Sequence, residues 1–248
     1  MLIQQRGDTV TLTTESVAYW FFRLNGCLTI TDFVVHPDPV DHHRQAGQRT
    51  DADILAVRFP YRAEFFHTNQ GAPMEDHQSL TPDGVRIDVI IAEVKASRCK
   101  LNGPWTNPAR ENMQRVLYAI GPFVQASVPT IADALYRDFI YRDEEFRVRL
   151  FAIGNAKSAK LHSSVVQMTW NDILGFIYQR FSIYQRVKAD HSHWDDAGKY
   201  LYRKFERHYP SLSQFKATVL EELEVSVPNL AFEEPDALRG ENLGADGT

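Results

Sequence analysis

The segment that decides the fold is VRIDVIIAEVK, residues 85–95. Its centre, Val89 to Ala92, is an unbroken apolar run, which indicates a strand buried inside a sheet. Charged side chains follow at Glu93 and Lys95, and strand geometry places these two on one side while Val94 points into the core. Burying such charges costs free energy unless a metal ion or a substrate compensates them. The end of this strand is therefore the first candidate for a functional site.

A second strand with an acidic start is expected at residues 53–59. Asp53 directly precedes its apolar residues, whereas Asp51 competes for the same role but is expected to be a loop acid. Asp88 is a weaker candidate, because parity along the strand turns it to the face opposite Glu93. Two carboxylates and an amine at neighbouring strand ends can hold a hard divalent cation beside a water molecule. That combination is the chemistry of metal-assisted phosphodiester cleavage.

The rest of the sequence alternates between helical and strand-like patterns. A start signal at residues 13–15 precedes a helix that ends before Asn25-Gly26. Further elements are predicted as strands at 27–36, 86–96 and 146–153, and as helices at 107–120, 131–141, 169–188, 195–208 and 211–224. Strands with helices on both sides indicate an α/β fold, a three-layer core with a mixed central sheet. We expect one domain over residues 1–188, a helical extension over 189–232 packed on the same core, and a disordered acidic tail over 233–248.

Composition sets limits on the class of protein. The 248 residues are 44% hydrophobic and 24% charged, as in an ordinary soluble globular protein. The sequence shows no signal-peptide pattern and no apolar run long enough to span a bilayer, so we expect a cytoplasmic protein without a membrane partner. Cys27 and Cys99 are too few for a disulfide framework or a structural zinc site. A net charge of −5 argues against indiscriminate nucleic-acid binding but is compatible with a local basic groove.

Two polar residues in the predicted helix at 107–120 add a third element. Gln114 and Tyr118 are four positions apart and therefore share a helix face. Taken as structure alone, Tyr118 is a core aromatic residue and Gln114 is a surface residue. Taken as part of a site, Gln114 orients a carboxylate or binds a strand end, and Tyr118 stacks or donates a hydrogen bond.

In combination, these residues resemble the PD-(D/E)XK nuclease superfamily and, within it, the RecB-like branch, whose pattern joins an acid, E-x-K and Q-x-x-x-Y. Here the pattern is carried by Asp53, Glu93-Val94-Lys95 and Gln114-Arg115-Val116-Leu117-Tyr118, in that order. The resemblance covers about residues 10 to 185 and implies a restriction-endonuclease-like core. One departure is that the segment between Asp53 and Glu93 is longer than the usual hairpin.

The resemblance also implies a mechanism, with Asp53, Glu93, Lys95, Gln114 and Tyr118 as catalytic residues. Mg²⁺ or Mn²⁺ would be held by both carboxylates and the Val94 carbonyl, and Glu15 matches an acidic position that related nucleases often place near the metal. Lys95 would either steer the attacking water or stabilise the transition state.

Several basic residues are candidates for contact with phosphates. Arg98, Lys100 and Arg115 cluster after the E-x-K strand, together with Arg110, although a plain solvated face is an equal alternative. Lys157, Lys160 and His162 follow the strand at 146–153 and are candidates for lining a substrate groove.

Aromatic and histidine residues leave further alternatives open. Trp105 either packs against the core or stacks on a base. The pairs His42-His43 and His191-Ser192-His193 resemble metal-binding tracts, but they lack a cysteine or third histidine at zinc-ligand spacing, so no zinc site is expected. The apolar face of the helix at 169–188 is a candidate dimer surface.

The leading hypothesis is therefore a Mg²⁺-dependent nuclease that acts on DNA, within a defence or repair system, as a homodimer or with a partner protein. A nuclease for RNA is one alternative. The other is a nuclease-fold protein that has become a binding or assembly subunit, although the presence of all three E-x-K-site residues argues against a retired site.

Overall fold

A mixed, open, six-stranded sheet forms the centre of the molecule. The computed structural model describes residues 11–36, 50–64, 73–188 and 191–225, so the predicted tail at 233–248 and His42-His43 lie outside the described residues. The strands are β1 (Leu28–Val35), β2 (Thr50–Arg58), β3 (Ile87–Val94), β4 (Ile140–Arg142), β5 (Phe146–Gly154) and β6 (Val166–Thr169). Their order is β1-β2-β3-β5-β4, and β6 also pairs with β5. β1, β2 and β3 are antiparallel neighbours, β5 is parallel to both β3 and β6, and β4 is antiparallel to β5.

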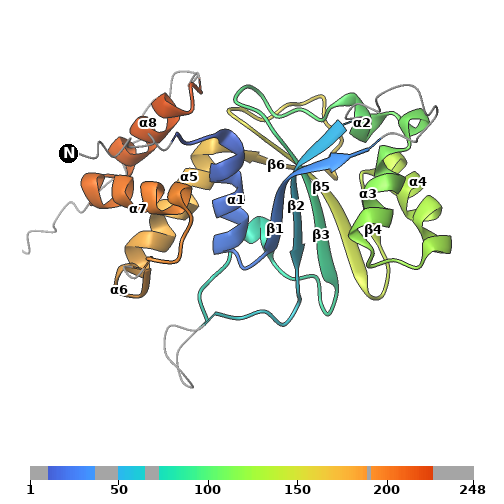
Figure 1. The fold of residues 1–248 in the computed structure, drawn as a ribbon, viewed down its shortest axis with the longest axis horizontal. Coiled ribbons are helices and arrows are strands. Elements are labelled where there is room, and N and C mark those ends of the chain that lie inside the picture. The colour runs from blue at the N-terminus through green and yellow to red at the C-terminus, as the bar shows by residue number, and fades with distance from the viewer. Residues whose placement is uncertain (1–10, 37–49, 65–72, 189–190, 226–248) are drawn as a thin grey trace, which may run out of the picture.

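Helices cover both faces of the sheet, as Figure 1 shows. They are α1 (Thr14–Leu24), α2 (Gly103–Thr106), α3 (Asn112–Ile120), α4 (Val128–Asp138), α5 (Trp170–Ile183), α6 (Gln185–Lys188), α7 (Asp196–His208) and α8 (Leu212–Glu222). α1 and α5 lie on one face, with α7 and α8 outside them, whereas α3 and α4 lie on the other face. The α/β prediction with flanking helices is confirmed. No helix within the described residues combines the length and the apolar character needed to cross a bilayer.

Local capping explains why α1 and α5 begin where the sequence predicts. Thr13 accepts a hydrogen bond from the Ser16 N–H at 3.1 Å, and the Ser16 hydroxyl accepts one in return from the Thr13 N–H. At α5, Thr169 and Asp172 form the same reciprocal capping box. Each box satisfies backbone donors that the first turn of a helix leaves unpaired.

Two apolar cores flank the sheet, one on each face. The first joins α1, α5, α7 and α8 to the sheet, and the second joins α2, α3 and α4 to its other face. The apolar face of α5 contributes Ile173, Ile177 and Phe181 to the first core, and all three are fully buried. The suggestion that this face forms a dimer surface is therefore wrong, because helices of the same chain already cover it.

Two predicted helices are present as α3 and α4 but have different boundaries, where non-glycine residues adopt left-handed backbone conformations. The helix predicted at 107–120 begins only at Asn112, since Asn107 caps a short 3₁₀ turn and Glu111 has a φ of 55°. The helix predicted at 131–141 ends at Asp138, where Phe139 has a φ of 58°. The next three residues, 140–142, form β4 instead.

The strand and helix boundaries also need corrections. β2 begins at Thr50, so Asp53 lies inside the strand rather than at its start. The strand β6 was not predicted from the sequence, and neither was β4. The helix predicted at 169–188 is interrupted at Tyr184, which separates α5 from α6.

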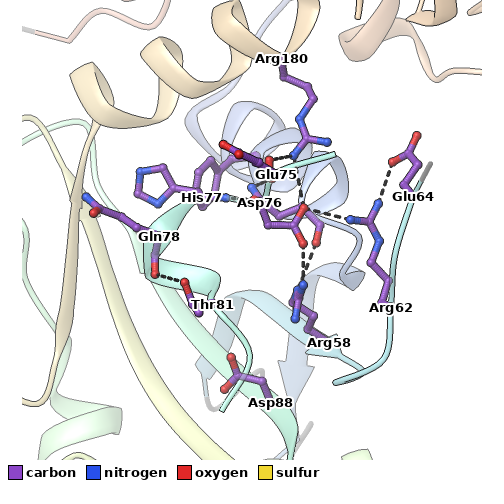
Figure 2. Close-up of polar contacts among 12 residues, drawn as sticks. Arg58, Arg62, Glu64, Glu75, Asp76, His77, Gln78, Thr81, Asp88 and Arg180 are labelled. Carbon is purple, nitrogen blue, oxygen red and sulfur yellow. Dashed lines mark hydrogen bonds and ion pairs between the residues drawn. The ribbon is translucent and has the colours of Figure 1, made fainter. Parts of the chain in front are cut away.

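Buried arginines anchor the long connection between β2 and β3. The Asp76 carboxylate accepts hydrogen bonds from Arg58 at 2.5 Å, Arg62 at 2.9 Å and Arg180 at 3.2 Å (Figure 2). The neighbouring His77 N–H donates to the side-chain oxygen of Asn25 at 2.7 Å. These contacts tie the connection to β2, to the end of α1 and to α5.

Candidate active site

The site lies where the pairing between β2 and β3 ends. The ladder closes with Ile54 opposite Ala92, and one step further along the same register Asp53 and Glu93 are neighbours. The Val94 N–H donates to Asp53 Oδ2 at 2.6 Å. The Asp53 carboxylate therefore takes the place of a backbone acceptor at the open end of the ladder.

Glu93 is buried, with 2% of its surface exposed, and both of its oxygens have partners. Trp105 Nε1 donates to Glu93 Oε2 at 2.7 Å. The side-chain amide of Asn102 donates to Glu93 Oε1. Glu93 is buried because the second core covers its face of β3, and Asp88 is buried on the opposite face of the same strand.

Lys95 follows the last residue of β3 and places its ammonium group between the two carboxylates. Its Nζ contacts Glu93 Oε1 and lies 3.6 Å from Asp53 Oδ2. The backbone is held on both sides, since the Lys95 N–H donates to the Ile153 carbonyl and the Lys95 carbonyl accepts from Trp170 Nε1, both at 3.0 Å. The side chain remains 30% exposed, so the site reaches solvent at this amine.

Burial and charge change the ionisation of all three groups. Burial raises the pKa of Asp53 above its ordinary value, against the opposing effects of the Val94 hydrogen bond and the Lys95 charge. Burial likewise raises the pKa of Glu93, and the nearby Asp53 charge adds to that rise. For Lys95, burial acts to lower the pKa, but its hydrogen bond to Glu93 and the two negative charges raise it above the ordinary value. The amine is therefore protonated at neutral pH.

The donor set fits a hard divalent cation such as Mg²⁺ or Mn²⁺, which prefers oxygen ligands. Asp53 and Glu93 supply carboxylate oxygens. The Val94 carbonyl belongs to the same strand edge as the N–H that meets Asp53, because the N–H and C=O of a strand residue point toward the same neighbour.

Glu15 does not join this pair as a third ligand. Its carboxylate accepts from the Thr14 hydroxyl at 3.1 Å, and within the described ranges no three His, Cys, Asp or Glu side chains converge on one possible metal position. Glu15 and Asp51 act on Asp53 at longer range, where their charges raise its pKa.

The Q-x-x-x-Y residues form no hydrogen bond with the acids in the described part of the chain. Gln114 is half-buried and Tyr118 is 47% exposed. Neither side chain hydrogen-bonds to Asp53, Glu93 or Lys95, or to any other residue that the structure describes. Gln114 lies in the first turn of α3 and Tyr118 one turn further along.

Two basic loops are joined at the same edge of the sheet. The Asn155 N–H donates to the Ser97 carbonyl at 2.7 Å, and the Cys99 N–H donates to the Ala156 carbonyl at 2.9 Å. Gly154 permits this approach, because a Cβ there would lie 2.4 Å from the Ser97 oxygen. The exposed side chains of these loops include four cations, Arg98, Lys100, Lys157 and Lys160.

Arg115 and His162 differ from these exposed cations. Arg115 is half-buried in α3, with one nitrogen 3.6 Å from the Glu111 carboxylate. The His162 ring stacks on Phe139 with 5.3 Å between the ring centres.

The contacts that hold the E-x-K segment in place were not predicted from the sequence, and they come from Asn102, Trp105 and Trp170. Trp105 is 1% exposed, so the suggestion that it stacks on a base is wrong and the packing alternative holds. The available signal was their place in the chain, because Asn102 and Trp105 lie only 7 and 10 positions after Lys95. Asp88, the weaker candidate, is buried on the opposite face and accepts hydrogen bonds from Arg147 and Arg149.

Comparison with known proteins provides no relative for this site. No protein-family model, curated protein or solved structure matches the chain.

Proposed function

We propose that the protein is a metal-dependent nuclease that hydrolyses phosphodiester bonds of DNA. The observation that carries this proposal is the convergence of Asp53, Glu93 and Lys95 at the end of a buried strand. Two desolvated carboxylates that share one ammonium group keep an excess of negative charge, which suits a divalent cation.

The arrangement of the elements supports a restriction-endonuclease-like core for the same proposal. A helix, α1, precedes three antiparallel strands, β1 to β3, and helices α3 and α4 then lead to β5, which is parallel to β3. This is the order that the resemblance to PD-(D/E)XK nucleases implies. The additional helices α7 and α8 pack against α5 on the opposite face of the sheet from α3 and α4.

In the proposed mechanism, Asp53, Glu93 and the Val94 carbonyl hold Mg²⁺ or Mn²⁺. When bound, the metal supplies a water of lowered pKa and offsets negative charge on the phosphate. Without a bound metal, burial acts to lower the pKa of Lys95, but the hydrogen bond to Glu93 and the charges of both acids raise it, so the amine is a cation. Its ammonium group would stabilise the charge that develops on the scissile phosphate, while its two carboxylate partners keep it in position.

The cations around the site favour a polyanionic substrate. Arg98 and Lys157 belong to two neighbouring loops that are joined by backbone hydrogen bonds. Arg98 Nη1 also donates to the Lys157 carbonyl at 2.8 Å. Both side chains are exposed, and so are those of Lys100 and Lys160 in the same two loops, which follow the ends of β3 and β5. Contacts of this kind position a nucleic-acid backbone without reading its sequence. The choice of DNA over RNA rests on the resemblance to RecB-like nucleases.

Cleavage assays test the proposal. Purified protein is incubated with single- and double-stranded DNA and RNA in Mg²⁺, Mn²⁺ or EDTA, beside Lys95→Ala and the matched variant Lys199→Ala. Lys199 is a lysine of similar exposure that lies 3.9 Å from Asp196 in α7. We expect wild type and Lys199→Ala to cut DNA with metal and not with EDTA, and Lys95→Ala to lose about a hundredfold in rate or more.

Other outcomes favour the alternatives. Cleavage confined to RNA would support the RNA-directed enzyme. Inactivity on every substrate with both metals would reject the enzyme and favour a nuclease-fold binding or assembly subunit.

A further inference from the structure

Two buried tryptophans hold the E-x-K segment, one from each apolar core. Trp105 belongs to the core beside α3 and α4 and donates to the Glu93 carboxylate, whereas Trp170 belongs to the core beside α1 and donates to the Lys95 carbonyl. Trp170 restrains the backbone. Trp105 is different, because its indole N–H meets a side chain of the proposed metal centre.

The two oxygens of the Glu93 carboxylate have different hydrogen-bond partners, because Trp105 contacts only one of them. Oε2 accepts from the indole, and Oε1 is the oxygen that contacts Lys95 and the Asn102 amide. Asp53 Oδ2 also lies near the Lys95 ammonium. With Oε2 held by the indole, Oε1 is the Glu93 oxygen that faces the cationic position between the two acids.

Trp105 is itself held rigidly. It lies in the short helix α2, and the Tyr136 hydroxyl from α4 donates to the Pro104 carbonyl at 3.3 Å and accepts from the Met113 N–H at 3.1 Å. One hydroxyl thus ties α2 to the start of α3. Because the indole is fully enclosed and its turn is anchored, it has little freedom to follow a Glu93 side chain that moves.

We propose that Trp105 is a positioning residue that presents Glu93 Oε1 to a divalent cation, an inference that rests on the proposed metal-dependent function. A carboxylate buried without this N–H would lose one hydrogen bond and rotate toward its remaining partners, Asn102 and Lys95. Partners of this type, which orient a metal ligand without touching the metal, typically change metal affinity by about 10- to 100-fold. The residue touches neither substrate nor metal in this role.

The chain contains a matched control for the experiment. Trp20 is also 1% exposed, and its Nε1 donates to the Asp195 carboxylate at 2.9 Å, at the start of α7. Trp20→Phe and Trp105→Phe therefore each remove a hydrogen bond from a buried indole to a carboxylate, which is exposed for Asp195 and buried for Glu93. Only the second change affects the proposed metal centre.

The test measures Mn²⁺ affinity by electron paramagnetic resonance for wild type, Trp105→Phe and Trp20→Phe, with thermal unfolding to show that each variant is folded. We expect Trp105→Phe to bind Mn²⁺ about tenfold more weakly or worse, and Trp20→Phe to bind like wild type. Equal affinity of Trp105→Phe and wild type would overturn the positioning role and leave the proposed nuclease intact. Absence of Mn²⁺ binding by folded wild type would reject both.

A second measurement uses the wild-type protein, so it does not depend on the folding of a variant. Nitrogen-15 labelling of tryptophan gives one indole N–H resonance for each ring, and Mg²⁺ is then titrated in. We expect the Trp105 resonance to shift with Mg²⁺ concentration while the Trp20 resonance stays in place. A Trp105 resonance that is unchanged when Mg²⁺ saturates the protein would contradict the inference.

Discussion

The strand β3 carries one buried acid near each end, and the two have opposite surroundings. Asp88, near the start, accepts hydrogen bonds from Arg147 at 2.8 and 3.0 Å and also from Arg149. Glu93, near the end, shares a single ammonium group, Lys95, with a second carboxylate. Arginines therefore outnumber the acid at one end of the strand, and acids outnumber the amine at the other.

The arginine-rich end continues into the connection between β2 and β3, where three guanidinium groups surround Asp76 (Figure 2). Cations of the chain itself therefore compensate the buried charge of Asp76. The carboxylate-rich end keeps uncompensated negative charge and an opening to solvent at Lys95. Burial of charge alone therefore does not mark a functional site in this protein, whereas an excess of buried charge of one sign does.

The largest expected effect is at the compensated end. Asp76→Asn leaves Arg58 and Arg180, which are nearly fully buried, without their carboxylate. Removing one partner of a buried ion pair costs about 3–5 kcal/mol of unfolding free energy. Chemical denaturation of wild type and variant measures this difference.

The control for that change is Glu64→Gln. Glu64 pairs with Arg62 at 2.7 Å but is 34% exposed, so its loss should cost less than about 1 kcal/mol. Similar losses for Asp76→Asn and Glu64→Gln would show that the buried arginine cluster does not anchor the connection.

The next effect concerns the carboxylate-rich end. A ligand that binds only the folded state at 100 times its dissociation constant stabilises it by about 2.7 kcal/mol. We therefore expect saturating Mg²⁺ to raise the unfolding temperature of wild type, and Asp53→Asn to abolish the rise. If Asp53→Asn and wild type gain equally from Mg²⁺, the ion binds elsewhere.

A smaller effect is expected from pH in protein without added metal. Burial raises the pKa of Asp53 in the folded state, so the folded state loses stability as pH rises from the unfolded pKa through the folded one. Asn cannot ionise, and its side-chain oxygen can still accept from the Val94 N–H. The stability of Asp53→Asn relative to wild type should therefore increase from acidic to neutral pH. Calorimetry across this range checks the sign, and a relative stability that falls with pH would contradict the role of burial.

The smallest effect is expected at Tyr118, an exposed residue whose hydroxyl has no partner among the described residues. Tyr118→Phe should change the unfolding free energy by no more than about 0.5 kcal/mol. Any loss in cleavage would then report a contact with substrate rather than a change in the fold. A large loss of stability would show that the hydroxyl supports the structure.

Elements with strong local signals could be predicted from the sequence. The capping residues Thr13 and Thr169 define helix starts, and the apolar run before Glu93 defines a central strand. The strands at 140–142 and 166–169 could not be predicted, because each has at most four residues and depends on pairing with β5. The left-handed conformations of Glu111 and Phe139 could not be predicted either, because neither residue is the glycine or asparagine that usually adopts this conformation.

The candidate site likewise has one part that could be predicted from the sequence and one part that could not. The proximity of Asp53 and Glu93 follows from two neighbouring antiparallel strands and a recognisable motif. The hydrogen bonds of Trp105 and Trp170 could not be predicted, because an indole N–H finds its partner only after both apolar cores have formed. The pairing of Asp88 with two arginines could not be predicted either, because these partners lie about 60 positions away along the chain.

The most direct test is a crystal of the protein grown with Mn²⁺ and measured at a wavelength where manganese scatters anomalously. We expect an anomalous peak between the carboxylates of Asp53 and Glu93, with Trp105 still hydrogen-bonded to Glu93. A fully ordered site with no peak there, in crystals whose Mn²⁺ concentration supports cleavage, would contradict the assignment of these residues as the metal centre.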